Sequence, residues 1–146
     1  MTAAGRVVGI DLGARRIGVA ICDSDRTVAS PERVLNRSGD QPREHREILD
    51  VVAEWEATLI VVGLPLSLDG GVGPAAQAVL DEVEHLRAVA PVPVETYDER
   101  FTTVSAERSL AEQQIRGPAR RQVVDKVAAA IMLQAWLDHR PRMNDT

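Results

Sequence analysis

Short apolar runs alternate with helical periodicities along this chain of 146 residues. The first run covers residues 6–12 and closes at Gly13, and a second run covers residues 17–22. Residues 27–35 can return as a third strand, which Pro31 interrupts because proline donates no hydrogen bond to a strand ladder. Apolar runs bounded by turn residues are typical of strands. The chain is therefore expected to open with a three-stranded antiparallel meander.

The pattern changes to helical spacing from Pro42, where apolar residues recur every three or four positions up to Trp55. Residues 58–62 then form a continuous run rich in β-branched residues, which is typical of a strand buried on both faces. A second helix is predicted over residues 74–89 and a last strand over residues 92–97.

The remaining part of the chain is predicted to be helical. A helix over residues 103–114 ends at the Gly117-Pro118 break, and Pro118 suits the first turn of a final helix that runs to about His139. The expected fold class is α/β. It consists of a five-stranded mixed sheet, in which an antiparallel meander is followed by two parallel strands, with helices on its flanks.

Length and composition bound the class of protein. The chain is long enough for one domain with a sizeable core, so residues 1–139 are expected to form a single domain and residues 140–146 a disordered polar tail. The lone Cys22 cannot form an internal disulfide, and no apolar run is long enough to span a bilayer. No N-terminal stretch combines a basic start, an apolar region and a small-residue cleavage site, so no leader peptide is expected. A cytoplasmic protein without membrane partners is expected.

The net charge of −5 argues against a uniformly basic surface that coats nucleic acid. It hides a local bias, because Arg116, Arg120, Arg121 and Lys126 stand close together with only Asp125 among them. This basic run is either a solvated helix face or a patch that contacts phosphates.

Acidic residues stand at three distant points of the chain: Asp11, the pair Asp98 and Glu99, and Asp125. Ligands gather at the carboxyl ends of parallel strands, where Asp11 ends the first strand and the acidic pair ends the last one. Asp125 lies in an otherwise apolar, alanine-rich helix, where a carboxylate is costly unless it is paired or bound to a cation. Its alternative partner is Arg121, one turn earlier.

Carboxylates from separate elements repel one another unless a cation lies between them. The three acidic points therefore predict a divalent-metal site, and such a site is suited to phosphodiester cleavage. Gly9 and Gly13 flank Asp11 and would allow a close approach of the backbone and a tight turn. Taken alone, Asp11 between glycines is more typical of a turn-capping residue.

Four motifs in this order resemble the YqgF or RuvX family of the ribonuclease H-like superfamily, over residues 6 to 138. They are Gly9-Ile10-Asp11-Leu12-Gly13 with Ile17-Gly18-Val19-Ala20, Val62-Gly63-Leu64-Pro65-Leu66 with Asp69-Gly70, Asp98-Glu99-Arg100-Phe101-Thr102-Thr103, and Val124-Asp125 with the alanine-rich helix after it. The resemblance implies a ribonuclease H-like fold and a nuclease. Members are named both pre-16S rRNA nucleases and Holliday junction resolvases.

The resemblance also implies which residues form the site. Mg²⁺ or Mn²⁺, as one ion or two, would be held by Asp11, Asp125 and one of Asp98 and Glu99. Many nucleases of the superfamily carry an acid at the end of the strand after the first helix, whereas this strand ends in Gly63-Leu64-Pro65. The missing acid must come from Asp98 or Glu99, and strand alternation lets only one of these neighbours face the site. Glu99 is the preferred candidate.

Basic residues beside the acids are candidates for contacts with nucleic acid: Arg15, Arg16, Arg100, Arg116, Arg121 and Lys126. They could equally form salt bridges that hold acidic loops in place. The substrate would be pre-16S rRNA or branched DNA, and the protein a monomer or a homodimer.

Two readings from other classes stay open. The segment from Asp11 to Gly18 also resembles the phosphate loop of the actin and hexokinase superfamily, although those proteins close two such domains around a nucleotide. A ribosome-maturation factor that binds RNA without cutting it would use the same residues. His45 and His85 are expected at the surface and Cys22 in the core.

Overall fold

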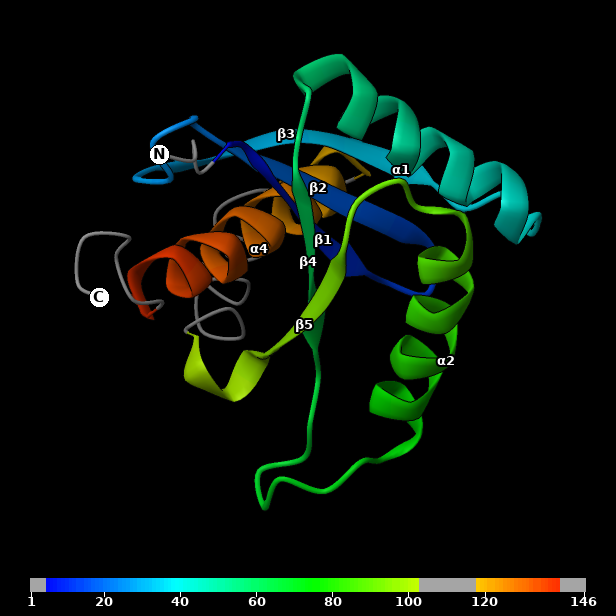
Figure 1. Ribbon diagram of the computed structural model, residues 1–146. Helices are drawn as coiled ribbons and strands as arrows, with labels where there is room; N and C mark the ends of the chain where they lie inside the picture. The colour runs from blue at the N-terminus through cyan, green and yellow to red at the C-terminus, as the bar shows by residue number, and fades with distance from the viewer. Residues whose placement is uncertain (1–4, 103–117, 140–146) are drawn as a thin grey trace.

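A five-stranded mixed sheet forms the centre of the protein in this computed structural model (Figure 1). The structure describes residues 5–102 and 118–139, with side chains of the last segment described from residue 126 onward. The strands lie in the order β3-β2-β1-β4-β5. Their bounds are β1 Val7–Leu12, β2 Arg16–Cys22, β3 Ala29–Asn36, β4 Leu59–Leu64 and β5 Val94–Asp98. β1, β2 and β3 form the antiparallel meander, and β4 and β5 run parallel to β1.

The helices cover both faces of this sheet (Figure 1). α1 Gln41–Trp55 and α2 Pro74–Val89 lie on one face, and α4 Pro118–His139 crosses the other. A short 3₁₀ turn, η1 Glu99–Phe101, follows β5 directly. No helix in residues 5–102 or 118–139 combines the length and the apolar character needed to cross a membrane.

Strand alternation divides the core into two clusters. Even-numbered residues of β1, including Val8 and Ile10, pack with buried residues of α1 and α2. Val7 packs on the opposite face with the alanine-rich part of α4, including Leu133 and Trp136. Because neighbouring residues of a strand point to opposite faces, the two sides of the sheet carry different chemistry.

The predicted elements are confirmed with small shifts at their ends. The helices over residues 74–89 and 118–139 have the expected bounds, and β4 is buried as its continuous apolar run predicts. β4 extends to Leu64, two residues beyond the predicted end, because Gly63 and Leu64 still pair with β5. The helix predicted over residues 103–114 and the predicted tail 140–146 lie outside the described residues.

The two glycines around Asp11 have different roles. A Cβ at Gly9 would lie 2.8 Å from the Cβ of Leu133, so Gly9 makes room for α4 rather than for a ligand. Gly13 makes the tight turn that its sequence context predicts: its N–H donates to the carbonyl of Arg16 at 3.0 Å, and a Cβ there would lie 2.7 Å from the same oxygen.

The outer strand β3 is irregular. Its pairing with β2 shifts between Val19 and Ala20, where Val19 lies opposite Arg33 and Ala20 opposite Pro31. Glu32 is thus an extra residue on β3, and it accepts a hydrogen bond from the indole N–H of Trp55 at 3.1 Å. This bulge occurs at the proline that interrupts the predicted strand.

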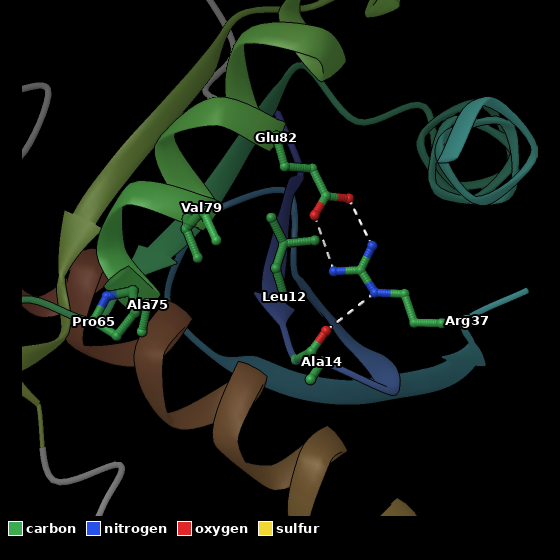
Figure 2. Close-up of a pocket in the computed structure, with 9 residues that line it drawn as sticks. Leu12, Ala14, Arg37, Pro65, Ala75, Val79 and Glu82 are labelled. Carbon is green, nitrogen blue, oxygen red and sulfur yellow. Dashed lines mark hydrogen bonds and ion pairs between the residues drawn. The ribbon is translucent and has the colours of Figure 1, made fainter. Parts of the chain in front are cut away.

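Arg37, directly after β3, joins the loop after β1 to both helices of its face (Figure 2). Its Nε donates to the carbonyl of Gly13 at 3.0 Å. One terminal nitrogen donates to Glu44 of α1 at 3.0 Å and to Glu82 of α2 at 2.7 Å, and the other donates to Glu82 at 3.0 Å. Glu44 also accepts from the backbone N–H groups of Ser38 and Gly39.

His45 belongs to the same cluster, so the expectation that it lies at the surface is wrong. Its side chain is only 4% exposed, and its Nε2 lies 2.8 Å from the carboxylate of Glu82. The polar partner on α2 makes burial of the imidazole favourable, and no pattern local to α1 reveals that partner. His85 is exposed and Cys22 is buried, as expected.

Arg37→Met should destabilise the protein strongly, because it leaves the carboxylates of Glu44 and Glu82 buried without their main cation. The expected loss in the free energy of unfolding is about 3–5 kcal/mol, measured by urea denaturation at pH 7. The matched control is Arg33→Met, whose ion pairs with Glu32 and Glu54 are more exposed and should be worth at most about 1 kcal/mol. Equal losses in the two variants would contradict this account.

Stability should also fall in acid through this cluster. Burial acts to raise the pKa of Glu82 and of Glu44, but the hydrogen bond from Arg37, the other hydrogen bonds that each carboxylate accepts and the nearby positive charge together outweigh it and hold each pKa below the ordinary 4.5. The unfolded state therefore binds protons first as the pH falls, and stability is lost below about pH 4.5. The melting temperature of Glu82→Gln should depend less on pH there than that of the wild type. Glu84→Gln, an exposed change on the same helix, should keep the wild-type slope.

Candidate active site at the carboxyl ends of the parallel strands

The carboxyl ends of β1, β4 and β5 lie side by side, and the predicted acids Asp11, Asp98 and Glu99 lie at the ends of β1 and β5. Asp11 is the next-to-last residue of β1, and Asp98 is the last residue of β5. Between them, Gly63 is the next-to-last residue of β4 and pairs with Tyr97 of β5. Glu99 opens η1 directly after β5. Asp11, Asp98 and Glu99 therefore share one edge of the sheet, as their positions after parallel strands predict.

Asp98 and Glu99, the neighbouring acids at the end of β5, lie on opposite faces of the sheet. Alternation puts Asp11 on the face of Val7 and Gly9, which α4 covers. The same alternation along β5 puts Asp98 on the face of Val94, toward α2. Glu99 falls on the α4 side, beside Gly63. The structure thus brings Glu99, and not Asp98, to the face that holds Asp11.

Asp98 is engaged by Arg100. The guanidinium of Arg100 contacts both carboxylate oxygens, with its Nη2 donating to Oδ2 at 2.6 Å, and the backbone N–H of Arg100 donates to Oδ1 at 2.9 Å. The hydrogen bonds from the Arg100 side chain hold the pKa of Asp98 below its ordinary value. Arg100 also donates to the carbonyl of Leu68 at 3.3 Å. The salt bridge that the sequence offered as an alternative role for Arg100 is present.

Glu99 extends over Gly63. A Cβ placed at Gly63 would lie 2.8 Å from Oε2 of Glu99 and 3.2 Å from both Cδ and Cγ. β1 and β4 pair in parallel up to Ile10 and Val62, so the next residues, Asp11 and Gly63, stand on adjacent strands about 4.8 Å apart. The carboxylate of Glu99 therefore occupies the end of β4, where the sequence supplies no acid, next to Asp11.

The remaining predicted residues are distributed around this edge. Arg15 is exposed in the loop after β1, and Arg16 is the first residue of β2. Asp125 lies on α4, two turns before Leu133, but its side chain and that of Arg121 are outside the described set. Arg116 lies outside the described residues altogether, whereas Lys126 is described and half-buried.

The chemistry of the donors fits a hard divalent cation. Asp11 and Glu99 offer carboxylate oxygens, which Mg²⁺ and Mn²⁺ accept as ligands. Within the described side chains, no group of three or more His, Cys, Asp and Glu residues is placed to hold a metal. The side chain of the third expected ligand, Asp125, lies outside the described set. His45 binds Glu82, and the Sγ of Cys22 accepts the Val7 N–H at 3.1 Å, so neither takes part in this site.

A cavity of about 250 Å³ opens beside this edge on the opposite face of the sheet (Figure 2). Leu12 and Pro65 line it where β1 and β4 end, and the Arg37–Glu82 pair closes one side.

Sequence reasoning missed Arg37 and Glu82, which stand in ordinary polar stretches and carry no motif. The sequence does show that the strand after the first helix ends in Gly63-Leu64-Pro65, where many nucleases of the superfamily carry an acid. This departure is the one signal that could have indicated the contact between Gly63 and Glu99.

Known proteins resemble this chain over nearly its whole length. Residues 5–139 match the family model described as "RuvX: Holliday junction resolvase". A relative from Mycobacterium sp. (strain KMS), named "Putative pre-16S rRNA nuclease", is 47% identical over 137 residues, which cover 93% of this chain and 81% of the relative. A protein of the same name from Mycobacterium ulcerans (strain Agy99) is 45% identical over 141 residues, covering 95% and 82%.

A solved structure shows the same fold. T. thermophilus RuvC in complex with Holliday junction substrate matches with a TM-score of 0.57 and 17% identity, over 91% of this chain and 93% of that one. At this identity the likeness shows the fold alone, which is ribonuclease H-like. The family match over nearly the whole chain and the identity to the mycobacterial relatives show that the chain belongs to the RuvX family.

Proposed function

We propose that this protein is a metal-dependent nuclease that hydrolyses phosphodiester bonds, and that it processes the 5′ end of pre-16S rRNA in the cytoplasm. The observation that carries the proposal is the meeting of Asp11 and Glu99 on one face of the sheet edge, from elements far apart in the sequence. The relatives named as pre-16S rRNA nucleases support this choice of substrate.

The residues that would hold the cation are Asp11, Glu99 and Asp125. Two carboxylates brought together on adjacent strand ends repel each other, and a divalent cation relieves that repulsion. The chemistry that one or two such ions supply when bound is a lowered pKa of the attacking water and stabilisation of the leaving oxygen. Asp11 lies on a strand and Glu99 on the turn directly after one, so regular backbone would hold both carboxylates in place.

Basic residues around the edge would hold the substrate backbone. Arg15 is exposed in the loop after β1, and Arg16, Arg100, Arg116, Arg121 and Lys126 are the further candidates. Arg100 already pairs with Asp98, so in this proposal its first role is to hold η1, and with it Glu99, at the end of β5. A guanidinium paired with one carboxylate still presents N–H groups to a phosphate.

A junction-resolving activity is the second candidate, favoured by the description of the family model. Both reactions use the same carboxylates and differ in the shape of the nucleic acid. A resolvase that cuts two symmetric strands requires a homodimer with two-fold symmetry, whereas trimming an rRNA end is possible for a monomer.

Asp11→Asn should reduce the cleavage rate by at least about 100-fold. Loss of a residue that only supports a metal ligand costs up to about 100-fold, and loss of a ligand itself should cost at least as much. The assay compares a labelled pre-16S rRNA 5′-leader fragment with a four-way DNA junction, each with Mg²⁺, Mn²⁺ or EDTA. Asp50→Asn, an exposed change on α1, is the matched control and should keep the wild-type rate.

The outcomes separate the candidates. Metal-dependent cutting of the RNA alone, lost in Asp11→Asn, is the expected result. Paired symmetric nicks in the junction would assign the resolvase activity instead. Binding of RNA without cutting by the wild type would leave a maturation factor that does not catalyse.

Glu99→Gln and Asp98→Asn should differ sharply, because the two carboxylates lie on opposite faces. Glu99→Gln should lower the cleavage rate about as much as Asp11→Asn. Asp98→Asn removes the charge that Arg100 binds, so it should lower the melting temperature and cost much less activity. The reverse ranking of the two rates would show that Asp98 is the acid of the site.

A further inference from the structure

Near the end of β4, the side chain of Glu99 occupies the space that a side chain at Gly63 would fill. A Cβ at Gly63 would lie 2.8 Å from Oε2 of Glu99, a separation that real Cβ atoms essentially never show. The Cγ and Cδ of Glu99 lie 3.2 Å from the same point, so three consecutive groups of this side chain rest on the glycine. Any larger residue at position 63 would have to displace Glu99.

Space, and not backbone conformation, accounts for this glycine. Gly5, Gly39 and Gly70 have positive φ angles, between 79° and 87°, whereas Gly63 lies in a regular strand and has no such angle. Its neighbours pair normally with β5, from Val62 opposite Thr96 to Leu64 opposite Asp98. Alanine could therefore adopt the backbone of residue 63 without strain.

The atoms that a methyl group at residue 63 would meet belong to the end of a flexible side chain. Glu99 can move by rotation of its own side-chain torsions, unlike Leu133 at Gly9, whose Cβ is fixed to a buried helix. The same movement would take the Glu99 carboxylate away from the end of β4, and so away from Asp11 on the adjacent strand. A change that the fold tolerates would thus disturb the arrangement of the two acids.

We propose that Gly63 is a positioning residue: because it has no side chain, the carboxylate of Glu99 can lie at the end of β4, beside Asp11. The acid that β4 itself lacks is in this way supplied from the turn after β5. This inference rests on the proposed function, in which Asp11 and Glu99 bind the same cation.

The test is the variant Gly63→Ala, followed by Mn²⁺ binding measured by electron paramagnetic resonance and by cleavage of the labelled RNA fragment. Mn²⁺ affinity should fall about 10- to 100-fold, as when a residue that orients a metal ligand is lost. The turnover rate should fall with it, while KM for the RNA stays close to the wild-type value. The melting temperature should hardly change.

Gly73→Ala is the matched control, because among the described residues a methyl group there would meet only the hydroxyl of Ser67, at an ordinary 3.5 Å. It should keep the wild-type Mn²⁺ affinity. Wild-type affinity in Gly63→Ala, with metal-dependent cleavage intact, would overturn the positioning role alone. Absence of Mn²⁺ binding and of cleavage in the wild type would overturn the proposed function itself, and this inference with it.

A double-mutant cycle on stability tests the contact independently of catalysis. If Gly63→Ala lowers the melting temperature or prevents folding, the cause should be the Glu99 side chain, and Glu99→Ala in the same chain should restore the fold. A double variant that is as unstable as Gly63→Ala would show that the glycine is needed for another reason and would contradict the proposal.

Discussion

The pairing of Arg37 with Glu44 and Glu82 is the interaction on which the arrangement of one whole face depends. One guanidinium binds a carboxylate from α1, a carboxylate from α2 and the carbonyl of Gly13, so three segments are held at a single point. Buried charges tolerate few alternative arrangements, because each one that loses its partner is strongly penalised. The loop that follows Asp11 is thereby fixed relative to both helices. The side chains of Arg37, Glu44 and Glu82 lie on the other side of the sheet from Asp11 and Glu99.

β1 separates two kinds of polar chemistry. The face toward α1 and α2 uses its charges internally, in ion pairs that leave little for a ligand. The face toward α4 carries Asp11 and receives Glu99 over Gly63. Because neighbouring residues of β1 point to opposite faces, the sheet keeps the ion pairs of the α1 and α2 side apart from the candidate site on the α4 side.

The sequence predicts most of the fold because hydrophobic period and turn residues are local signals. Residues 74–89 show the 3.6-residue pattern and Thr58 to Val62 the buried-strand pattern, and both elements form as expected. The order of parallel strands also predicts that Asp11 and Glu99 share an edge. The burial of His45 could not be predicted, because its partner Glu82 lies 37 residues away and only packing of α1 against α2 brings them together. The fit of Glu99 over Gly63 is likewise a product of side-chain packing between strands.

The bulge of β3 at Pro31 has a consequence for assembly. β3 is one outer strand of the sheet, and an outer strand with a regular row of free N–H and C=O groups invites a strand from another molecule. Pro31 offers no N–H, and the extra residue Glu32 breaks the spacing of the row, so this side resists extension into a continuous intermolecular sheet. At the other outer strand, β5, the carbonyl of Val94 is bound by Arg87. That carbonyl is therefore not available to a strand of another molecule, so both outer strands of the sheet carry a feature that opposes edge-to-edge aggregation.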